Sequence, residues 1–291
     1  MRIQLDWFDE RLTARISAIV AGQLAPAVAR DAATVMVVRP APAQAADAGA
    51  GAGDGAEVLM LKRPAAMAFA PGAYDYPGGS VDPADDDPRI GWAGPAPEEF
   101  GAWLGTSAGQ ARALVCAAVR ETFEESGVLL AGRADGSPVA PDESSWAAER
   151  AALAAGQVTF AELLAERGLV VRADLLTPWA RWITPEAEPR RFDARFFAAA
   201  LPDGQRASGD HAEADRIAWL RPQAALSAAT TGEMLLLPPT VATLREFAAC
   251  GGVAQILASR RQIDPVMPRM VVEDGTAWLL IPDEAGYGDL S

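Results

Sequence analysis

The chain has 291 residues, half of them hydrophobic and 22% charged, which is typical of a soluble globular protein whose core needs no disulfide or metal for stability. Lysine and arginine number 25 against 39 aspartates and glutamates, and the formal net charge of −14 argues against nucleic acid and anionic membranes as partners, because both repel an acidic surface. The two cysteines, Cys116 and Cys250, lie far apart outside any C-x-x-C pattern, which argues against a disulfide framework or zinc site and makes the cytoplasm the expected location.

The N-terminal segment predicts a helical extension rather than a signal peptide. Asp6, Asp9 and Glu10 interrupt the apolar stretch that a signal peptide needs. Spaced apolar residues predict a helix over residues 8–30. We therefore assign residues 1–31 to an extension and 32–291 to one domain. No run approaches the length of about 18 apolar residues that a membrane-spanning helix needs, so none is expected.

Two strands and two loops are predicted next. Residues 33–40 are rich in β-branched side chains, short and closed by a proline, which predicts a buried strand, and residues 57–64 are expected to form the next strand. The alanine- and glycine-rich stretch 41–56 between them is of low complexity and predicts a flexible loop. Residues 70–106 hold much of the proline, glycine and aspartate, and predict a second loop.

A long helix is predicted to begin at Ser107 and to end before Gly127. Ser107 followed three residues later by Gln110 is a capping-box pattern, and a glycine often ends a helix. The remainder of the chain mixes strands and helices, which predicts an α/β or α+β fold. The expected elements are helices at 143–155 and 159–168 within a helical insertion of about 131–170, strands at 178–184, 191–201 and 216–220, a helix at 239–250, and a hairpin at about 269–282 that turns at Asp274 and Gly275.

Three glutamates crowd the end of the long helix. Glu121, Glu124 and Glu125 lie at positions i, i+3 and i+4, so they share one face, and Arg120 is four residues before Glu124, the offset of a helical ion pair. Such a run is most often a solvated helix face. However, like charges at i and i+4 cost about 0.2–0.5 kcal/mol per pair, and the helix dipole disfavours negative charge at a C-terminus. Divalent cations such as Mg²⁺ or Mn²⁺ would remove both penalties, so the face predicts a metal site.

The same segment, RETFEESGV at residues 120–128, resembles the second half of the Nudix box, G-x5-E-x7-R-E-U-x-E-E-x-G-U. The first half resembles residues 76–85, with Gly79 as the opening glycine and Asp85 where the family has glutamate. Residues 86–119 separate the halves where the pattern has seven residues, so we place an insertion at about 86–112. Flanking segments, among them AFAPGAYDYPGG and LLPPTVATLREF, resemble the interrupted-box Nudix subgroup that includes the peroxisomal acyl-coenzyme A diphosphatases.

The resemblance implies a Nudix α/β/α sandwich with a mixed sheet and metal-dependent hydrolysis of a diphosphate bond. It implies that Glu121, Glu124 and Glu125 bind Mg²⁺ or Mn²⁺, that one of them or a nearby carboxylate takes the proton of the attacking water, and that Arg120 orients a glutamate of the set. Gly79 would permit the turn that brings strand and helix together. Whether Asp85 or Glu213 takes part in catalysis is left open.

The expected substrate is a small nucleotide derivative, namely coenzyme A or an acyl-CoA, cleaved to 3′,5′-ADP and 4′-phosphopantetheine or its acyl form. ADP-ribose and NADH are the alternatives within the class, and a non-catalytic Nudix-fold binding module is the alternative outside it. Ala68 occupies the position of an arginine in the better known coenzyme A motif, which weakens that specificity. We select Arg63 and Arg191, together with Gly79, as substrate-binding residues. The assembly is left open, with a homodimer as one option.

Overall fold

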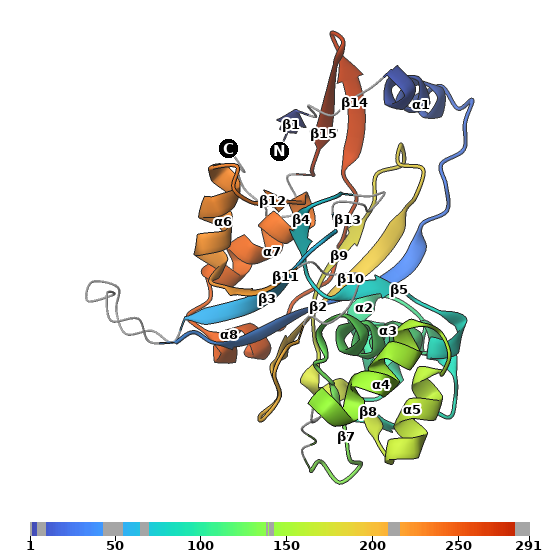
Figure 1. Cartoon of the computed structure of the whole chain (residues 1–291). Helices are drawn as coiled ribbons and strands as arrows, with labels where there is room; N and C mark the ends of the chain where they lie inside the picture. Colours follow the sequence, from blue (N-terminus) through green and yellow to red (C-terminus); the bar gives the residue numbers. More distant parts are fainter. Residues whose placement is uncertain are drawn as a thin grey trace.

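The computed structural model describes residues 2–4, 10–42, 55–64, 70–137, 139, 143–208 and 216–282. A mixed nine-stranded sheet forms the centre, in the order β12-β4-β3-β2-β10-β9-β13, with β11 paired to β3 and β5 paired to β2 (Figure 1). The parallel pairs are β2 with β10, β4 with β12 and β9 with β13. The strands are β2 (Arg30–Pro40), β3 (Ala56–Lys62), β4 (Ala73–Asp75), β5 (Gly78–Ser80), β9 (Thr177–Ile183), β10 (Phe192–Ala200), β11 (Arg216–Leu220), β12 (Leu235–Leu236) and β13 (Pro265–Val266).

Helices cover both faces of this sheet, as Figure 1 shows. Successive side chains of a strand point to opposite faces. Accordingly, Val35 and Val37 of β2 pack in one hydrophobic core, and Met36 and Val38 pack in the other. The predicted α/β/α sandwich is thereby confirmed. The first face carries α2 (Pro97–Leu104), α3 (Ala108–Ser126), α4 (Glu143–Ala154) and α5 (Phe160–Arg167), and the second carries α6 (Pro222–Thr230), α7 (Pro238–Ala248) and α8 (Val253–Ala258).

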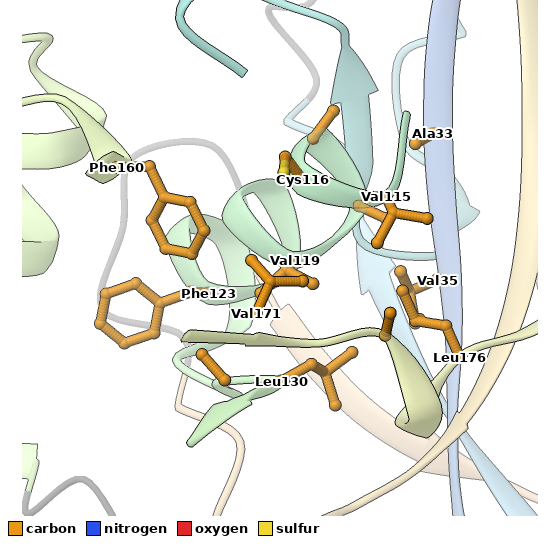
Figure 2. Close-up of a cluster of buried hydrophobic side chains, with 14 of the residues drawn as sticks. Ala33, Val35, Val115, Cys116, Val119, Phe123, Leu130, Phe160, Val171 and Leu176 are labelled. Carbon is orange, nitrogen blue, oxygen red and sulfur yellow. The ribbon is translucent and has the colours of Figure 1, made fainter. Parts of the chain in front are cut away.

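The central element of the first face is α3, whose apolar stripe lies on β2. Figure 2 shows Val115 close to Ala33 and Val35, with Val119 and Phe123 further along the helix. These side chains are buried, so the position of α3 on the sheet is fixed along most of its length.

The ends of α3 follow the predicted signals with one difference. The hydroxyl oxygen of Ser107 accepts a hydrogen bond from the amide of Gln110, as an N-cap should. The side chain of Gln110 does not close a capping box, because its amide donates to Asp31 Oδ2 at 2.6 Å and so ties the helix to β2. Gly127 ends the helix in the left-handed conformation, with φ of 71°.

Two small sheets flank the sandwich. The N-terminal strand β1 (Arg2–Gln4) joins the hairpin of β14 (Arg269–Glu273) and β15 (Thr276–Leu280), which turns at the predicted Asp274 and Gly275. Helix α1 (Glu10–Val20) lies beside this hairpin (Figure 1). The other sheet contains β6 (Trp92–Ala93), β8 (Val170–Arg172) and β7 (Ala131–Gly132), and two short 3-10 helices are η1 (Pro83–Asp86) and η2 (Ala173–Leu175).

Two predicted segments differ from the structure. The helix expected over residues 8–30 ends at Val20, because Gly22 has φ of 69° and Pro26 has no amide hydrogen to continue the helix; residues 8 and 9 lie outside the described part of the chain. The loop expected over residues 70–106 contains β4, β5, η1, β6 and the whole of α2. Its prolines lie between these short elements or at their first residues, which the composition alone does not reveal.

The box insertion packs into the core. In α2, Phe100 and Leu104 are buried, and the ring of Phe100 lies against Phe197 of β10 with centroids 6.5 Å apart. Arg112 of α3 donates to the carbonyl oxygens of Asp87 and Ile90, which anchors the start of the insertion. None of the helices in the described part of the chain has both the length and the apolar character that crossing a bilayer requires.

Candidate active site

Arg120 of α3 is the centre of a cluster of carboxylates. Its Nε and Nη2 donate to the two carboxylate oxygens of Asp85 at 2.8 and 2.9 Å. Its Nη1 donates to Glu121 at 2.9 Å and to Glu124 at 3.2 Å, the second being the predicted i,i+4 ion pair. Nη2 also donates to the carbonyl oxygen of Ser80 in β5. One guanidinium thus connects the strand, the 3-10 helix and the face of α3 that carries the glutamates.

Asp85 comes from the upstream half of the box and reaches this cluster across 34 intervening residues. It is the third residue of η1, where its side chain accepts from the amide of Asp82 at 2.8 Å in a capping box. Its side chain is fully buried. Asp85 therefore contacts Arg120 directly, and whether it takes part in catalysis stays an open question. Glu213, the other open candidate, lies outside the described residues.

The glycine turn places backbone against the glutamates. The amide of Gly78 donates to Glu125 Oε2 at 2.8 Å. A Cβ added at Gly79 would overlap the carboxylate of Glu121, so β5 and α3 approach each other at a distance that excludes any side chain there. β5 is in turn held by β2, where Gly79 pairs with Ala33. Neither Gly78 nor the carbonyl of Ser80 carries a signal in the sequence beyond its place in the glycine-rich turn.

The electrostatics of the cluster follow from burial and mutual contact. Burial raises the pKa of Glu121 to about 7, against the opposing effect of the Arg120 charge. Burial works to lower the pKa of Arg120, but the hydrogen bonds to Asp85 and the charges of Glu121 and Glu124 outweigh it, so this pKa lies above its ordinary value. At neutral pH Arg120 is therefore a fixed cation, whereas Glu121 is close to its titration midpoint.

The fit to a metal rests on the chemistry of the donors. Glu121 and Glu124 expose about 15 and 16% of their side chains, and Arg120 uses only one oxygen of each. No group of three or more histidine, cysteine, aspartate or glutamate side chains converges as a ready-made metal site within the described residues. Carboxylate oxygens on one helix face fit a hard divalent cation, and a glutamate whose pKa is raised by burial gains from such a charge.

The two predicted substrate-binding arginines lie next to the ends of strands. Arg63 follows β3 and its backbone pairs with Ala73 of β4. Arg191 precedes β10, is buried, and donates to the carbonyl oxygens of Thr184 and Ala27. Its guanidinium therefore holds the chain together at this position, and a role for either arginine in binding substrate stays a prediction. Ala68 lies outside the described residues.

Comparison with known proteins gives a consistent set of similarities. A family model described as the NUDT19 Nudix domain matches residues 102–247, which is half of the chain and includes Arg120 and the three glutamates. The acyl-coenzyme A diphosphatase NUDT19 of Homo sapiens is 30% identical over 234 residues, covering 67% of this chain and 61% of that protein. The protein of the same name from Gallus gallus is 29% identical over 249 residues, covering 72% of this chain and 65% of the other.

The structural comparison agrees with the sequence matches. The crystal structure of a NUDIX hydrolase from Alicyclobacillus acidocaldarius superimposes with a TM-score of 0.62 at 29% identity, and the match covers 81% of this chain and 99% of that one. By contrast, this chain spans only about three fifths of the length of the curated relatives it matches.

Proposed function

The chain belongs to the Nudix hydrolase family, and on this premise we propose that it hydrolyses the diphosphate bond of a nucleoside diphosphate linked to another moiety. The observation that carries the proposal is the contact of Arg120 with Asp85, Glu121 and Glu124. It unites the two halves of the box in one site despite the insertion between them. A binding module without catalysis would have no need to keep this buried arrangement of charges, which costs desolvation energy.

In the proposed reaction, Glu121, Glu124 and Glu125 would hold the divalent metal ion that Nudix hydrolases generally use, here Mg²⁺ or Mn²⁺. When bound, the ion would neutralise phosphate charge and acidify the attacking water. Arg120 holds one oxygen of Glu121 and one of Glu124, and Asp85 holds Arg120. A carboxylate of this set takes the proton from the water as it attacks phosphorus. The amide of Gly78 fixes Glu125 from the other side.

Coenzyme A or an acyl-CoA is the substrate that we propose, with 3′,5′-ADP and 4′-phosphopantetheine or its acyl form as products. The support is the similarity to two proteins named acyl-coenzyme A diphosphatase. Arg63 and Arg191 remain the proposed contacts for substrate phosphates. Because both cysteines are unpaired, we also propose a reducing compartment such as the cytoplasm. A homodimer stays an untested option.

A panel assay tests the substrate. The purified protein is incubated with Mg²⁺ or Mn²⁺ and with coenzyme A, a short and a long acyl-CoA, ADP-ribose or NADH, and the products are identified by mass. Release of 3′,5′-ADP from the coenzyme A compounds well above the other turnovers supports the proposal. Turnover of ADP-ribose or NADH alone would keep diphosphate hydrolysis and reject coenzyme A. Absence of turnover with bound metal would favour the binding module.

A pair of variants tests the site. Glu124→Gln keeps the shape of the side chain but removes the charge, so we expect kcat to fall at least about 100-fold while the thermal melt is retained. The matched control is Glu162→Gln on α5, where the carboxylate caps the helix by accepting from the Thr159 amide at 2.9 Å, a bond that glutamine can also accept. This control should keep full activity. Full activity of Glu124→Gln would reject the proposed ligand set.

A further inference from the structure

Arg150 of α4 connects the helical insertion to the end of the catalytic helix. Its side chain is buried, with about 5% of the residue exposed. Its Nε donates to the carbonyl oxygen of Glu124 at 2.9 Å. Its Nη1 donates to Ser208 Oγ at 3.0 Å, and its Nη2 donates to the carbonyl oxygen of the same serine at 3.1 Å. The guanidinium thus joins three segments, namely α4, the last turn of α3 and the chain that follows β10.

The hydrogen bonds of Arg150 and Ser208 go to carbonyl groups at the end of α3 that have no partner within the helix. The last four carbonyl groups of a helix have no partner within the helix. In α3 the carbonyl of Phe123 accepts from the Gly127 amide, that of Glu124 accepts from Arg150, and that of Ser126 accepts from the Ser208 amide at 2.8 Å. Arg150 and Ser208 therefore cap the turn that carries Glu124 and Glu125.

Packing between the two helices fixes the arginine. Trp146 and Arg150 are four residues apart and so lie on one face of α4. The ring of Trp146 meets Phe123 edge to face, with centroids 5.8 Å apart, next to the carbonyl that Arg150 binds. On α5, Arg167 lies over the Trp146 ring at 4.5 Å and pairs with Glu149.

The positive charge of Arg150 lies at the C-terminal end of α3, where it is electrostatically favourable. The C-terminal end of a helix carries partial negative charge, and α3 adds Glu121, Glu124 and Glu125 within its last turns. A buried cation bonded to the last turn opposes this accumulation from inside the protein, on the far side of the backbone from solvent. The guanidinium lies against Gly127, where an added Cβ would be 3.1 Å from Nη1.

We propose that Arg150 is a positioning residue for the metal site: it holds the last turn of α3 so that Glu124 and Glu125 are set for binding the divalent ion. The proposal rests on the metal-dependent function above and extends it to the helical insertion. Arg150 touches neither substrate nor metal in this scheme. Its effect is transmitted through the backbone of Glu124.

The test compares Arg150→Met, Arg150→Lys and the matched control Arg167→Met. Mn²⁺ affinity is measured by the electron paramagnetic resonance signal of the free ion, together with kcat and the thermal melt. We expect Arg150→Met to weaken Mn²⁺ binding by about 3- to 30-fold, because loss of the hydrogen bonds to the Glu124 carbonyl and to Ser208 leaves the turn that carries Glu124 and Glu125 less well fixed. Arg150→Lys retains the charge but not the forked geometry, and should recover part of this loss. Arg167→Met loosens the same helical pair and should keep Mn²⁺ affinity within about twofold.

Two results would overturn the proposal. One is an unchanged Mn²⁺ affinity in Arg150→Met. The other is an equal loss in Arg150→Met and Arg167→Met, because both would then act by loosening the insertion as a whole. If Arg150→Met does not fold, Arg150→Lys and Ser208→Ala decide by the same comparison with Arg167→Met. Failure of the wild-type protein to bind Mn²⁺ would instead reject the proposed function, so the two failures are distinguishable.

Discussion

The ion pair between Asp85 and Arg120 is supported by the hydrogen bonds that both buried side chains make. Asp85 is buried and accepts from Arg120 twice and from the Asp82 amide once, while Arg120 is only 12% exposed. A buried ion pair offsets its desolvation cost only with such geometry, and loss of one partner leaves a costly buried charge. The shorter side chain of aspartate is therefore accommodated, because η1 presents it to the fork of the guanidinium.

At Gly79 the close approach of β5 to Glu121 gives a sharp prediction. Gly79→Ala places a methyl group where the Glu121 carboxylate lies, so we expect kcat/KM to fall by about 10- to 100-fold as that side chain is displaced. Gly109→Ala on α3 is the control, because nothing lies within 4 Å of its added Cβ and alanine favours a helix. Steady-state kinetics measure both. Equal activities of the two variants would contradict the role given to Gly79.

The raised pKa of Glu121 predicts proton release on metal binding. In the metal-free protein the pKa of Glu121, about 7, lies above the ordinary glutamate value of 4.5, so the contribution of Glu121 to stability is present below pH 4.5 and is lost as the pH rises through 7. A cation competes with this proton, and its affinity should therefore rise by up to about tenfold per pH unit until pH 7 and then level off.

Titration calorimetry with Mg²⁺ or Mn²⁺ between pH 5.5 and 8, in buffers of different ionisation enthalpy, measures this release. We expect the protein to release up to one proton per bound ion, most of it below pH 7, and the buffer to take this proton up. Affinity independent of pH over this range would show that Glu121 binds the ion without having held a proton.

Among the elements, α2 decides what the box insertion does. Phe100 is fully buried against Trp92, Trp103 and Phe197, whereas Trp103 of the same helix keeps 38% of its surface exposed. The insertion thus contributes a helix to the core of the sandwich and is not a peripheral loop. This explains how the two halves of the box stay together: the inserted chain leaves the site at Asp87, is anchored by Arg112, and returns through α2 to the start of α3.

Phe100→Ala should therefore lower the free energy of unfolding by about 3–5 kcal/mol, as for other buried phenylalanines. Trp103→Ala should cost clearly less, because the exposed part of that ring leaves no cavity. Denaturant unfolding followed by circular dichroism compares the two. Similar small losses in both variants would mean that α2 is not part of the core.

For the molecule as a whole, the reactivity of a thiol buried in one of the two hydrophobic cores can report global unfolding. Cys116 of α3 is fully buried, and burial raises its pKa to about 12. Cys250, at the end of α7, is only half-buried, and burial raises its pKa as well.

In the Cys250→Ser variant at pH 8, we expect Cys116 to react with a disulfide reagent only at the rate of global unfolding, and to react at once in denaturant. The absorbance of the released thiol measures the rate. Rapid modification of the native variant would indicate local opening of α3, which would also undermine a fixed position for the glutamates.

Most local features of this fold could be predicted from the residues alone. Features that depend on residues a few positions apart were predictable. They are the apolar stripe and the terminal glycine of α3, the central strands of the sheet, the hairpin at Asp274 and Gly275, and the ion pair of Arg120 with Glu124. The family could be inferred for the same reason, since the second half of the box is continuous. The elements within residues 70–106 were missed, because turn-rich composition masks short strands that form only by pairing. The division at residue 31 and the substrate-binding arginines stay predictions.

Contacts across the sheet or across the insertion became known from the three-dimensional structure. The contacts in question are those of Asp85 with Arg120, of Gly79 with Glu121, of Phe100 in α2 with Phe197, and of Arg150 with the Glu124 carbonyl. Each joins residues that are 26 to 97 positions apart in the sequence. Sequence spacing cannot give these contacts, because they are fixed by the packing of side chains from separate elements at close range. The proposed chemistry could therefore be inferred from the residues, whereas the proposed site is assembled by the fold.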